Sequence, residues 1–128
     1  MQNKTVLENK PIDTEGLTDL IVDSIQDIKG KNILKLDLRL LDDAPADFFI
    51  ICEGDSGTQV NAIAGNIVKR LKEEVDTLPS HVEGRDFSKW VLVDYFDVIV
   101  HVFYPETRQF YEIEELWSDA QSTEYQNI

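Results

Sequence analysis

Apolar positions along the chain recur at helical spacing in two long segments, each of which begins with a capping signal. The first segment runs through residues 13–30, where Asp13 or Thr14 can cap the start of a helix. The second begins after Ser56, which forms a capping box with Gln59 ahead of a long apolar stripe. The pattern therefore predicts two amphipathic helices that each cover a core.

Strand patterns fill the segment between these helices. Residues 33–40 alternate, which predicts a half-exposed strand with one apolar face formed by Leu34, Leu36, Leu38 and Leu40. Residues 48–52 are continuously apolar, and such a strand is expected to be covered on both faces.

The longest apolar stretch, residues 90–103, predicts two β-strands that meet at Tyr95-Phe96-Asp97. Alternation in the first strand puts Trp90, Leu92 and Asp94 on one face and Val91, Val93 and Tyr95 on the other. In the second strand one face is wholly apolar and consists of Val98, Val100 and Val102. The opposite face is mixed and consists of Asp97, Ile99, His101 and Phe103. A face that combines aromatic rings, a carboxylate and an imidazole is unusual for a core, so it is the first candidate for a binding surface.

The remaining elements complete a single domain. Residues 81–83 predict a short strand, and residues 106–117 predict one or two short helices that pack back on the sheet. The order α-β-β-α-β-β-β-α indicates an α/β domain with a mixed sheet of about five strands and helices packed on it. The β-α-β portion within residues 48–82 could supply a parallel pair.

Three regions are expected along the chain. Residues 1–12 form a flexible N-terminal arm, residues 13–117 form the folded domain, and residues 118–128 form a polar, mobile C-terminal tail.

The formal net charge of −13 restricts the classes of partner. It argues against a nucleic-acid-binding surface and against anionic membranes, because both need a basic patch. It favours a basic protein partner, although solubility alone is an equal explanation of the charge. The single cysteine, Cys52, excludes an internal disulfide, and the N-terminus has neither a signal core nor an Arg-rich transit pattern. A cytoplasmic protein is therefore expected.

The sequence offers no convincing catalytic set. Two histidines and one cysteine, far apart along the chain, do not predict a metal site or a nucleophile–base pair. The turn in residues 54–57 lacks the lysine of a P-loop, and Asp55 would repel a phosphate. Asp94 and Asp97 are better explained as turn carboxylates than as magnesium ligands. We therefore expect no catalytic residue, no metal and no cofactor.

Several segments in this order and spacing are similar to the ribosomal silencing factor family (RsfS, also called Iojap-like proteins). The match covers roughly residues 15–117 and includes the following stretches: Asp47-Phe48-Phe49-Ile50-Ile51-Cys52, Val82-Glu83-Gly84, Trp90-Val91-Leu92-Val93-Asp94-Tyr95, Asp97-Val98-Ile99-Val100-His101-Val102-Phe103, and residues 108–117. The resemblance implies a topology related to nucleotidyltransferases without their activity. One departure is Phe96, where many relatives carry glycine; a large side chain there changes the turn or adds an apolar contact.

The resemblance also implies a function in translation regulation. Members of the family bind the large ribosomal subunit at its fourteenth protein, block joining with the small subunit and so repress translation under nutrient limitation. The family pattern places the docking surface at the positions of Trp90, Tyr95, Asp97, His101 and Phe103. When the protein is free, the same apolar surface predicts a weak homodimer.

Two alternatives remain open. One is an active enzyme with a nucleotidyltransferase fold, which the sequence disfavours because Arg39 stands where the second metal-binding carboxylate after Asp37 is needed. The other is an adaptor for a different basic protein.

Overall fold

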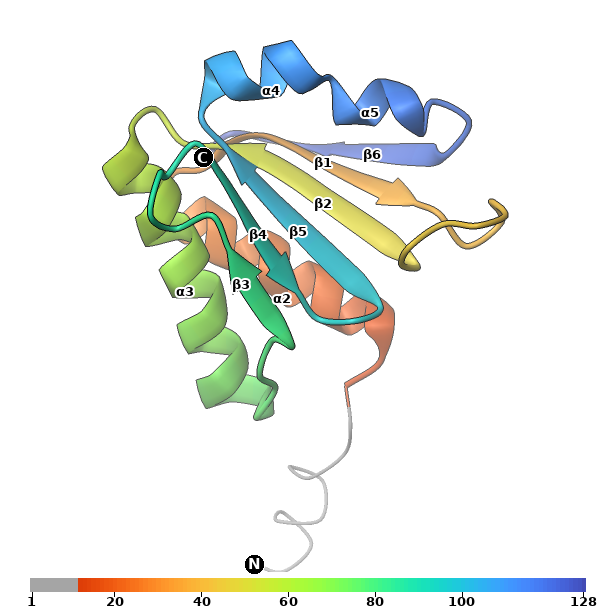
Figure 1. The fold of residues 1–128 in the computed structure, drawn as a ribbon. Helices are drawn as coiled ribbons and strands as arrows, with labels where there is room; N and C mark the ends of the chain where they lie inside the picture. Colours follow the sequence, from red (N-terminus) through yellow and green to blue (C-terminus); the bar gives the residue numbers. More distant parts are fainter. Residues whose placement is uncertain (1–11) are drawn as a thin grey trace, which may run out of the picture.

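The computed structural model describes residues 12–128, which form one mixed six-stranded sheet with helices on both faces (Figure 1). The elements follow in the order α2 (Thr14–Asp27), β1 (Lys31–Asp37), β2 (Phe48–Glu53), α3 (Gly57–Val75), β3 (His81–Glu83), β4 (Trp90–Asp94), β5 (Val98–Phe103), α4 (Pro105–Tyr111), α5 (Ile113–Leu116) and β6 (Gln121–Tyr125). The predicted α/β class and the mixed sheet are confirmed.

The sheet has the strand order β3-β4-β5-β2-β1-β6. Its single parallel pair is β2 with β5, in which Phe48 lies opposite Val98, and all other neighbours are antiparallel. The expected parallel pair within residues 48–82 does not form, because β3 pairs with β4 at the edge of the sheet. The parallel partner of β2 is instead β5, the last strand of the antiparallel β3–β4–β5 meander.

Helices α2 and α3 cover one face of the sheet, and both start at the predicted caps. The Asp13 carboxylate accepts a hydrogen bond from the Gly16 N–H at 2.7 Å, and the Ser56 hydroxyl accepts one from the Gln59 N–H at 3.1 Å. Beneath them lies the larger core, which includes Ile21, Ile25, Ile50, Ile63, Ile67, Val91, Val93, Tyr95, Val98, Val100 and Val102. The faces predicted for β4 and β5 from alternation are the faces observed.

The prediction of a mobile tail after residue 117 is wrong for residues 121–125. They form β6, which pairs antiparallel with β1 from Asp37↔Gln121 to Ile33↔Tyr125. Backbone hydrogen bonds hold this edge strand, while all of its side chains except Tyr125 are exposed, so its polar sequence carries little strand signal. The sheet therefore has six strands rather than about five. The predicted arm at residues 1–12 lies, except for Ile12, outside the described residues.

The first strand also ends earlier than predicted. β1 stops at Asp37, and Leu38 is buried in the loop that follows, whereas Leu40 is 94% exposed. Alternation applies only while the backbone is extended. Leu40 therefore does not share the apolar face of the strand.

Candidate protein-binding surface

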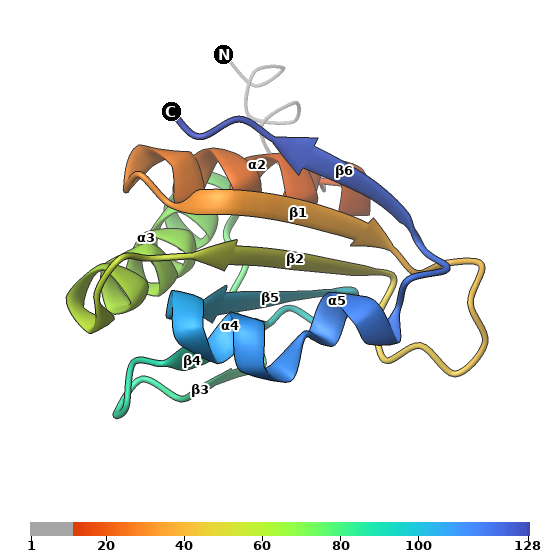
Figure 2. The same cartoon turned by 90° about the horizontal axis from the view of Figure 1, so that it is seen from above.

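The second face of the sheet is covered only in part, by the short helices α4 and α5, as Figure 2 shows. A smaller apolar cluster lies on this side and contains Leu36, Leu38, Phe49, Ile51, Ile99, Phe103 and Ile113. Trp90 and Leu92 pack against its edge and remain half-buried. This is the mixed face that the sequence singled out as a binding surface.

Aromatic rings stack around Trp90. Its ring centroid lies 4.8 Å from Phe103, 5.0 Å from Tyr111 and 5.9 Å from His101. Tyr111 in turn contacts Phe110 edge to face at 4.9 Å. Contacts of this kind hold an indole in one orientation and present one of its sides to solvent.

The structure does not bring all five predicted interface residues to one exposed surface. Phe103 is 0% exposed and His101 is 5% exposed, so both lie beneath Trp90 and support it. Tyr95 is 7% exposed and lies on the opposite face, in the core under α2 and α3. Asp97 is exposed, but it lies in the β4–β5 turn at the far end of the hairpin from Trp90. Of the five, only Trp90 and Asp97 offer side chains to a partner without rearrangement.

His101 accepts a hydrogen bond that orients Trp90. The Trp90 Nε1–H donates to His101 Nδ1 at 3.1 Å, which places the proton of a neutral imidazole on Nε2. Burial lowers the pKa of His101 from 6.5 to about 4, so the ring is neutral at pH 7. His101 is therefore a positioning residue for Trp90 rather than a partner contact.

Other exposed apolar side chains extend the surface around Trp90, although the sequence pattern did not assign them to it. Phe110 on α4 is 79% exposed, and Tyr111 is 52% exposed. Beside Trp90 a hollow of about 290 Å³ is lined by Glu83, Gly84, Trp90 and Leu92. We call Trp90, Leu92, Phe110 and Tyr111 the aromatic face. The seven-residue helix α4 buries no side chain, so its apolar residues lie on the surface; this is seen in the structure and not in the sequence pattern.

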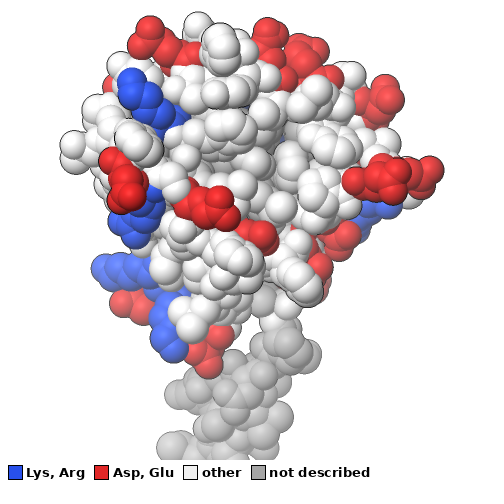
Figure 3. All heavy atoms as spheres, in the orientation of Figure 1, with Lys and Arg blue, Asp and Glu red and all other residues white. Residues whose placement is uncertain are grey.

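The charge distribution agrees with a docking role for the aromatic face. Seen from the side of Figure 1, a broad uncharged area lies below α4, with Asp and Glu side chains above, to the right of and below it and mostly Lys and Arg side chains along the left (Figure 3). An apolar centre with a polar rim is the usual anatomy of a protein interface.

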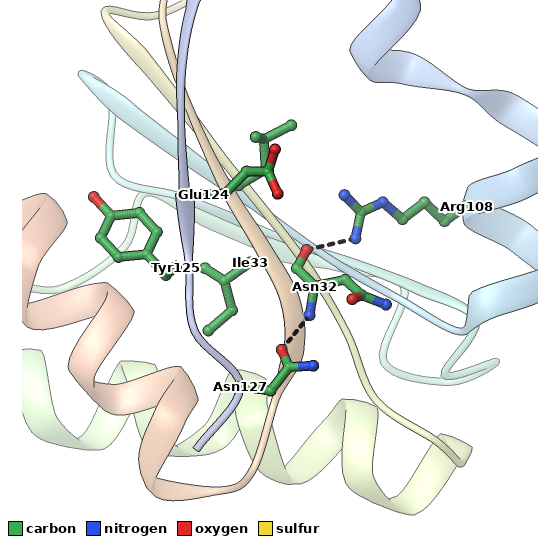
Figure 4. Close-up of a pocket in the computed structure, with 7 residues that line it drawn as sticks. Asn32, Ile33, Arg108, Glu124, Tyr125 and Asn127 are labelled. Carbon is green, nitrogen blue, oxygen red and sulfur yellow. Dashed lines mark hydrogen bonds between the residues drawn. The ribbon is translucent and has the colours of Figure 1, made fainter.

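Arg108 fastens α4 and α5 to the sheet. Its guanidinium donates to the Asn32 carbonyl at 2.7 Å, to the Glu53 carboxylate at 3.0 Å and to the Glu114 carboxylate at 2.9 Å. Beside it lies a hollow of about 430 Å³, shown in Figure 4, where the Asn32 N–H donates to Asn127 Oδ1 at 2.9 Å. These polar groups bond one another and tie the end of the chain to β1, so the hollow has a structural role.

Residues 12–128 contain no group of three or more His, Cys, Asp or Glu side chains arranged to hold a metal ion. Within the same residues, no helix has the length and apolar character needed to cross a membrane. Cys52 is fully buried in β2, and burial raises the pKa of its thiol to about 12.

The fold is a mixed α/β domain with an aromatic face beside two short helices. Comparison with known proteins identifies the family. The family model described as "Ribosomal silencing factor during starvation" matches residues 11–128. The chain therefore belongs to the ribosomal silencing factor family, as the sequence resemblance predicted.

Individual relatives agree with this assignment. The chain is 36% identical over 114 residues to the ribosomal silencing factor RsfS of Halalkalibacterium halodurans, which covers 89% of this chain and 96% of that protein. It is 35% identical over 74 residues to the mouse protein named mitochondrial assembly of ribosomal large subunit protein 1, which covers 56% of this chain and 32% of that protein. A crystal structure from Chromobacterium violaceum superposes with a TM-score of 0.80 at 37% identity, covering 84% of this chain and 88% of that chain. The names of the first two relatives describe silencing or assembly of ribosomes rather than an enzymatic activity.

Proposed function

We propose that this protein binds the large ribosomal subunit at its fourteenth ribosomal protein and blocks joining with the small subunit, so that translation falls when nutrients are scarce. The observation that carries the proposal is the aromatic face, which holds a large apolar area open to solvent around a rigidly oriented Trp90. Hot spots of protein interfaces are enriched in Trp and Tyr at such positions. The net charge of −13 suits a basic ribosomal protein as the partner.

The mechanism that follows is steric exclusion without turnover. A domain of about this size, with a radius of gyration of roughly 13–15 Å, obstructs a subunit interface once it is docked there. Inhibition is then stoichiometric and saturates at about one protein per large subunit. It acts on free subunits, because the docking site is covered in ribosomes that have already joined.

Order of addition tests the mechanism. The protein is mixed either with separated subunits or with preassembled ribosomes, and the joined fraction is measured on sucrose gradients. We expect strong inhibition in the first case and weak inhibition in the second. Inhibition at amounts far below stoichiometric would indicate catalytic modification of the ribosome and would contradict the exclusion mechanism.

Replacement of Trp90 tests the docking surface. Trp90→Ala should weaken binding to purified large subunits by about 2 kcal/mol, or roughly 30-fold, if Trp90 is a hot spot. Tyr125→Ala is a matched control, because it removes a partly buried aromatic ring on the opposite face of the sheet. Equal affinity for Trp90→Ala and the wild-type protein would exclude the aromatic face as the docking site.

The same face carries the expectation of a weak homodimer in the free protein. Light scattering at high concentration should detect dimers that Trp90→Ala reduces. A protein that remains monomeric at every concentration would remove the homodimer without affecting the proposal for the ribosome.

A further inference from the structure

The loop between β3 and β4, residues 84–89, carries exposed cations and an exposed aromatic ring on an otherwise acidic protein. Phe87 is 85% exposed, and Arg85 and Lys89 on either side of it are exposed as well. Among residues 12–128, the Lys and Arg side chains with no carboxylate at ion-pair distance are Lys29, Lys69, Arg85 and Lys89. The loop therefore contributes two of the unpaired cations, with an aromatic ring between them.

Helix α3 holds this loop in place. The Asn61 side-chain amide donates to the Arg85 carbonyl at 3.2 Å and also to the Ser88 hydroxyl. The Ser88 hydroxyl in turn donates to the Arg85 carbonyl at 3.1 Å. Ser88 also packs against the start of α3, where a Cβ at Gly57 would lie 3.0 Å from the Ser88 Cβ. The conformation of the loop is thus set by contacts with α3 that use the Arg85 backbone and leave its side chain available.

The Arg85 guanidinium lies over Gly65 in the middle of α3. A Cβ at Gly65 would be 3.7 Å from Arg85 Nη2, with no other neighbour within 4 Å apart from the helix itself. Lys69 follows Gly65 by four residues, so the exposed Lys69 lies one turn further along the same face of the helix. The unpaired cations Lys69 and Arg85 therefore share one surface. We call Lys69, Arg85, Phe87 and Lys89 the basic loop patch.

The basic loop patch lies where the charge pattern of the surface changes. Figure 3 shows mostly Lys and Arg side chains along the left, the side on which α3 lies in Figure 1. The carboxylates of Glu83 and Asp86 are close in sequence, but neither is paired with a cation of the patch. The net charge of −13 repels nucleic acid from the surface as a whole, whereas unpaired cations at one place attract an anion locally.

The chemistry of the patch suits RNA. Guanidinium and ammonium groups bind phosphates, and an exposed aromatic ring stacks on an unpaired base. Proteins recognise single-stranded RNA by this combination of cations and stacking rings. The patch also adjoins the aromatic face, since the loop ends at Trp90 and Gly84 lines the same hollow as Trp90.

We propose that the basic loop patch contacts a single-stranded stretch of RNA on the large ribosomal subunit, next to the protein that the aromatic face binds. Lys69, Arg85 and Lys89 bind phosphates, and Phe87 stacks on an unpaired base. The inference rests on the proposed function and gives the docked protein a second partner of different chemistry. It departs from the expectation, drawn from the net charge of the whole chain, that no nucleic acid is bound.

The salt dependence of binding tests the phosphate contacts. The dissociation constant for purified large subunits is measured at several salt concentrations for the wild-type protein, Arg85→Gln and Lys89→Gln. Each variant should lower the slope of log Kd against log salt by about 0.7, the value for one phosphate contact to a single strand. Lys29→Gln is the matched control, because it removes an exposed, unpaired cation from the turn between α2 and β1. It should leave the slope unchanged.

Replacement of the ring tests stacking. Phe87→Ser should raise the dissociation constant at fixed salt about fivefold or more, without changing the slope. Leu78→Ser is the control for an exposed apolar side chain, because Leu78 is 65% exposed after α3, and it should bind within twofold of the wild-type protein. Circular dichroism should show the same thermal unfolding midpoint for all of these variants.

Photocrosslinking identifies the partner. With p-benzoylphenylalanine incorporated at the position of Phe87, irradiation on large subunits should give an adduct that ribonuclease digests. An adduct with ribosomal protein alone would mean that the patch binds an acidic protein segment, and would overturn the inference.

The outcomes separate this inference from the proposed function. If Trp90→Ala binds weakly while Arg85→Gln, Lys89→Gln and Phe87→Ser behave like their controls, the RNA contact is wrong and the proposed docking stands. If the three variants of the patch show the expected changes while Trp90→Ala binds like the wild-type protein, the RNA contact stands and docking through the aromatic face fails.

Discussion

Acid should destabilise this protein through His101 in a way that one substitution can isolate. The imidazole is 5% exposed, accepts from Trp90 at 3.1 Å, and has its Nε2 buried without a hydrogen-bond partner among residues 12–128. Burial lowers its pKa from 6.5 to about 4. Between these two values the unfolded chain binds a proton that the folded protein does not. Stability therefore falls as the pH is lowered through this window, and His101 adds no further loss below pH 4.

The size of the effect follows from the two pKa values. At pH 4.5 the unfolded imidazole is almost fully protonated and the folded one is mostly neutral. Linkage then gives a loss of about 2–3 kcal/mol relative to pH 7. A loss of this size is a large fraction of the stability of a domain of about 100 residues.

The assay is urea unfolding followed by circular dichroism at pH 7 and pH 4.5, for the wild-type protein and for His101→Phe. Phenylalanine keeps an aromatic ring between Phe49 and Phe103 and gives up the bond to Trp90. At pH 7 the two proteins should therefore differ by about 1 kcal/mol or less.

Between pH 7 and pH 4.5 the wild-type protein should lose about 2–3 kcal/mol more than the variant. The carboxylates are common to both proteins, so their contribution cancels in the difference. Equal losses in the two proteins would mean that His101 is accessible to protons in the folded state, and the account of Trp90 orientation given above would have to be abandoned.

Two further substitutions test the surroundings of the surface. Tyr95→Phe removes a hydroxyl that is buried without a hydrogen-bond partner among the described residues. Urea unfolding should therefore show unchanged stability or a gain of up to about 1 kcal/mol, and the affinity for large subunits should not change. Weaker binding would place Tyr95 at the interface after all. Arg108→Met removes the donor that joins α4 and α5 to Asn32 and Glu53, and should lower the free energy of unfolding by about 2–4 kcal/mol in the same assay. Arg39→Met is the control at a more exposed ion pair and should lower it by less than about 1 kcal/mol. Similar losses in the two variants would contradict the anchoring role of Arg108.

The faces of the central hairpin could be predicted from the alternation of its residues alone. Side chains alternate strictly along a strand, so Trp90 and Leu92 had to lie opposite Val91, Val93 and Tyr95, and the structure has them so. The caps of α2 and α3 could also be predicted, because a capping bond joins residues only three apart. The α/β class followed from the order of these local patterns.

The burial of each residue of the mixed face could not be predicted in the same way. Alternation predicts on which side of the sheet a side chain lies. The elements that cover that side are distant in the sequence, so alternation does not predict how deeply the side chain is buried. Phe103 is completely buried beneath Trp90 and in a cluster with Ile113 of α5, whereas Trp90 is only half-buried, although both residues belong to the same face. The predicted interface therefore contained supporting residues together with exposed ones.

The strand β6 and the exposure of Leu40 were also decided by tertiary structure. An edge strand is held by backbone hydrogen bonds to its neighbour, and these depend on no side-chain pattern. Leu40 continues the alternation of β1 in sequence but lies beyond the last extended residue, Asp37. Local patterns report only periodicity. The pairing of β1 with a strand some 90 residues later depends on contacts between distant parts of the chain, and so does the point at which that pairing ends.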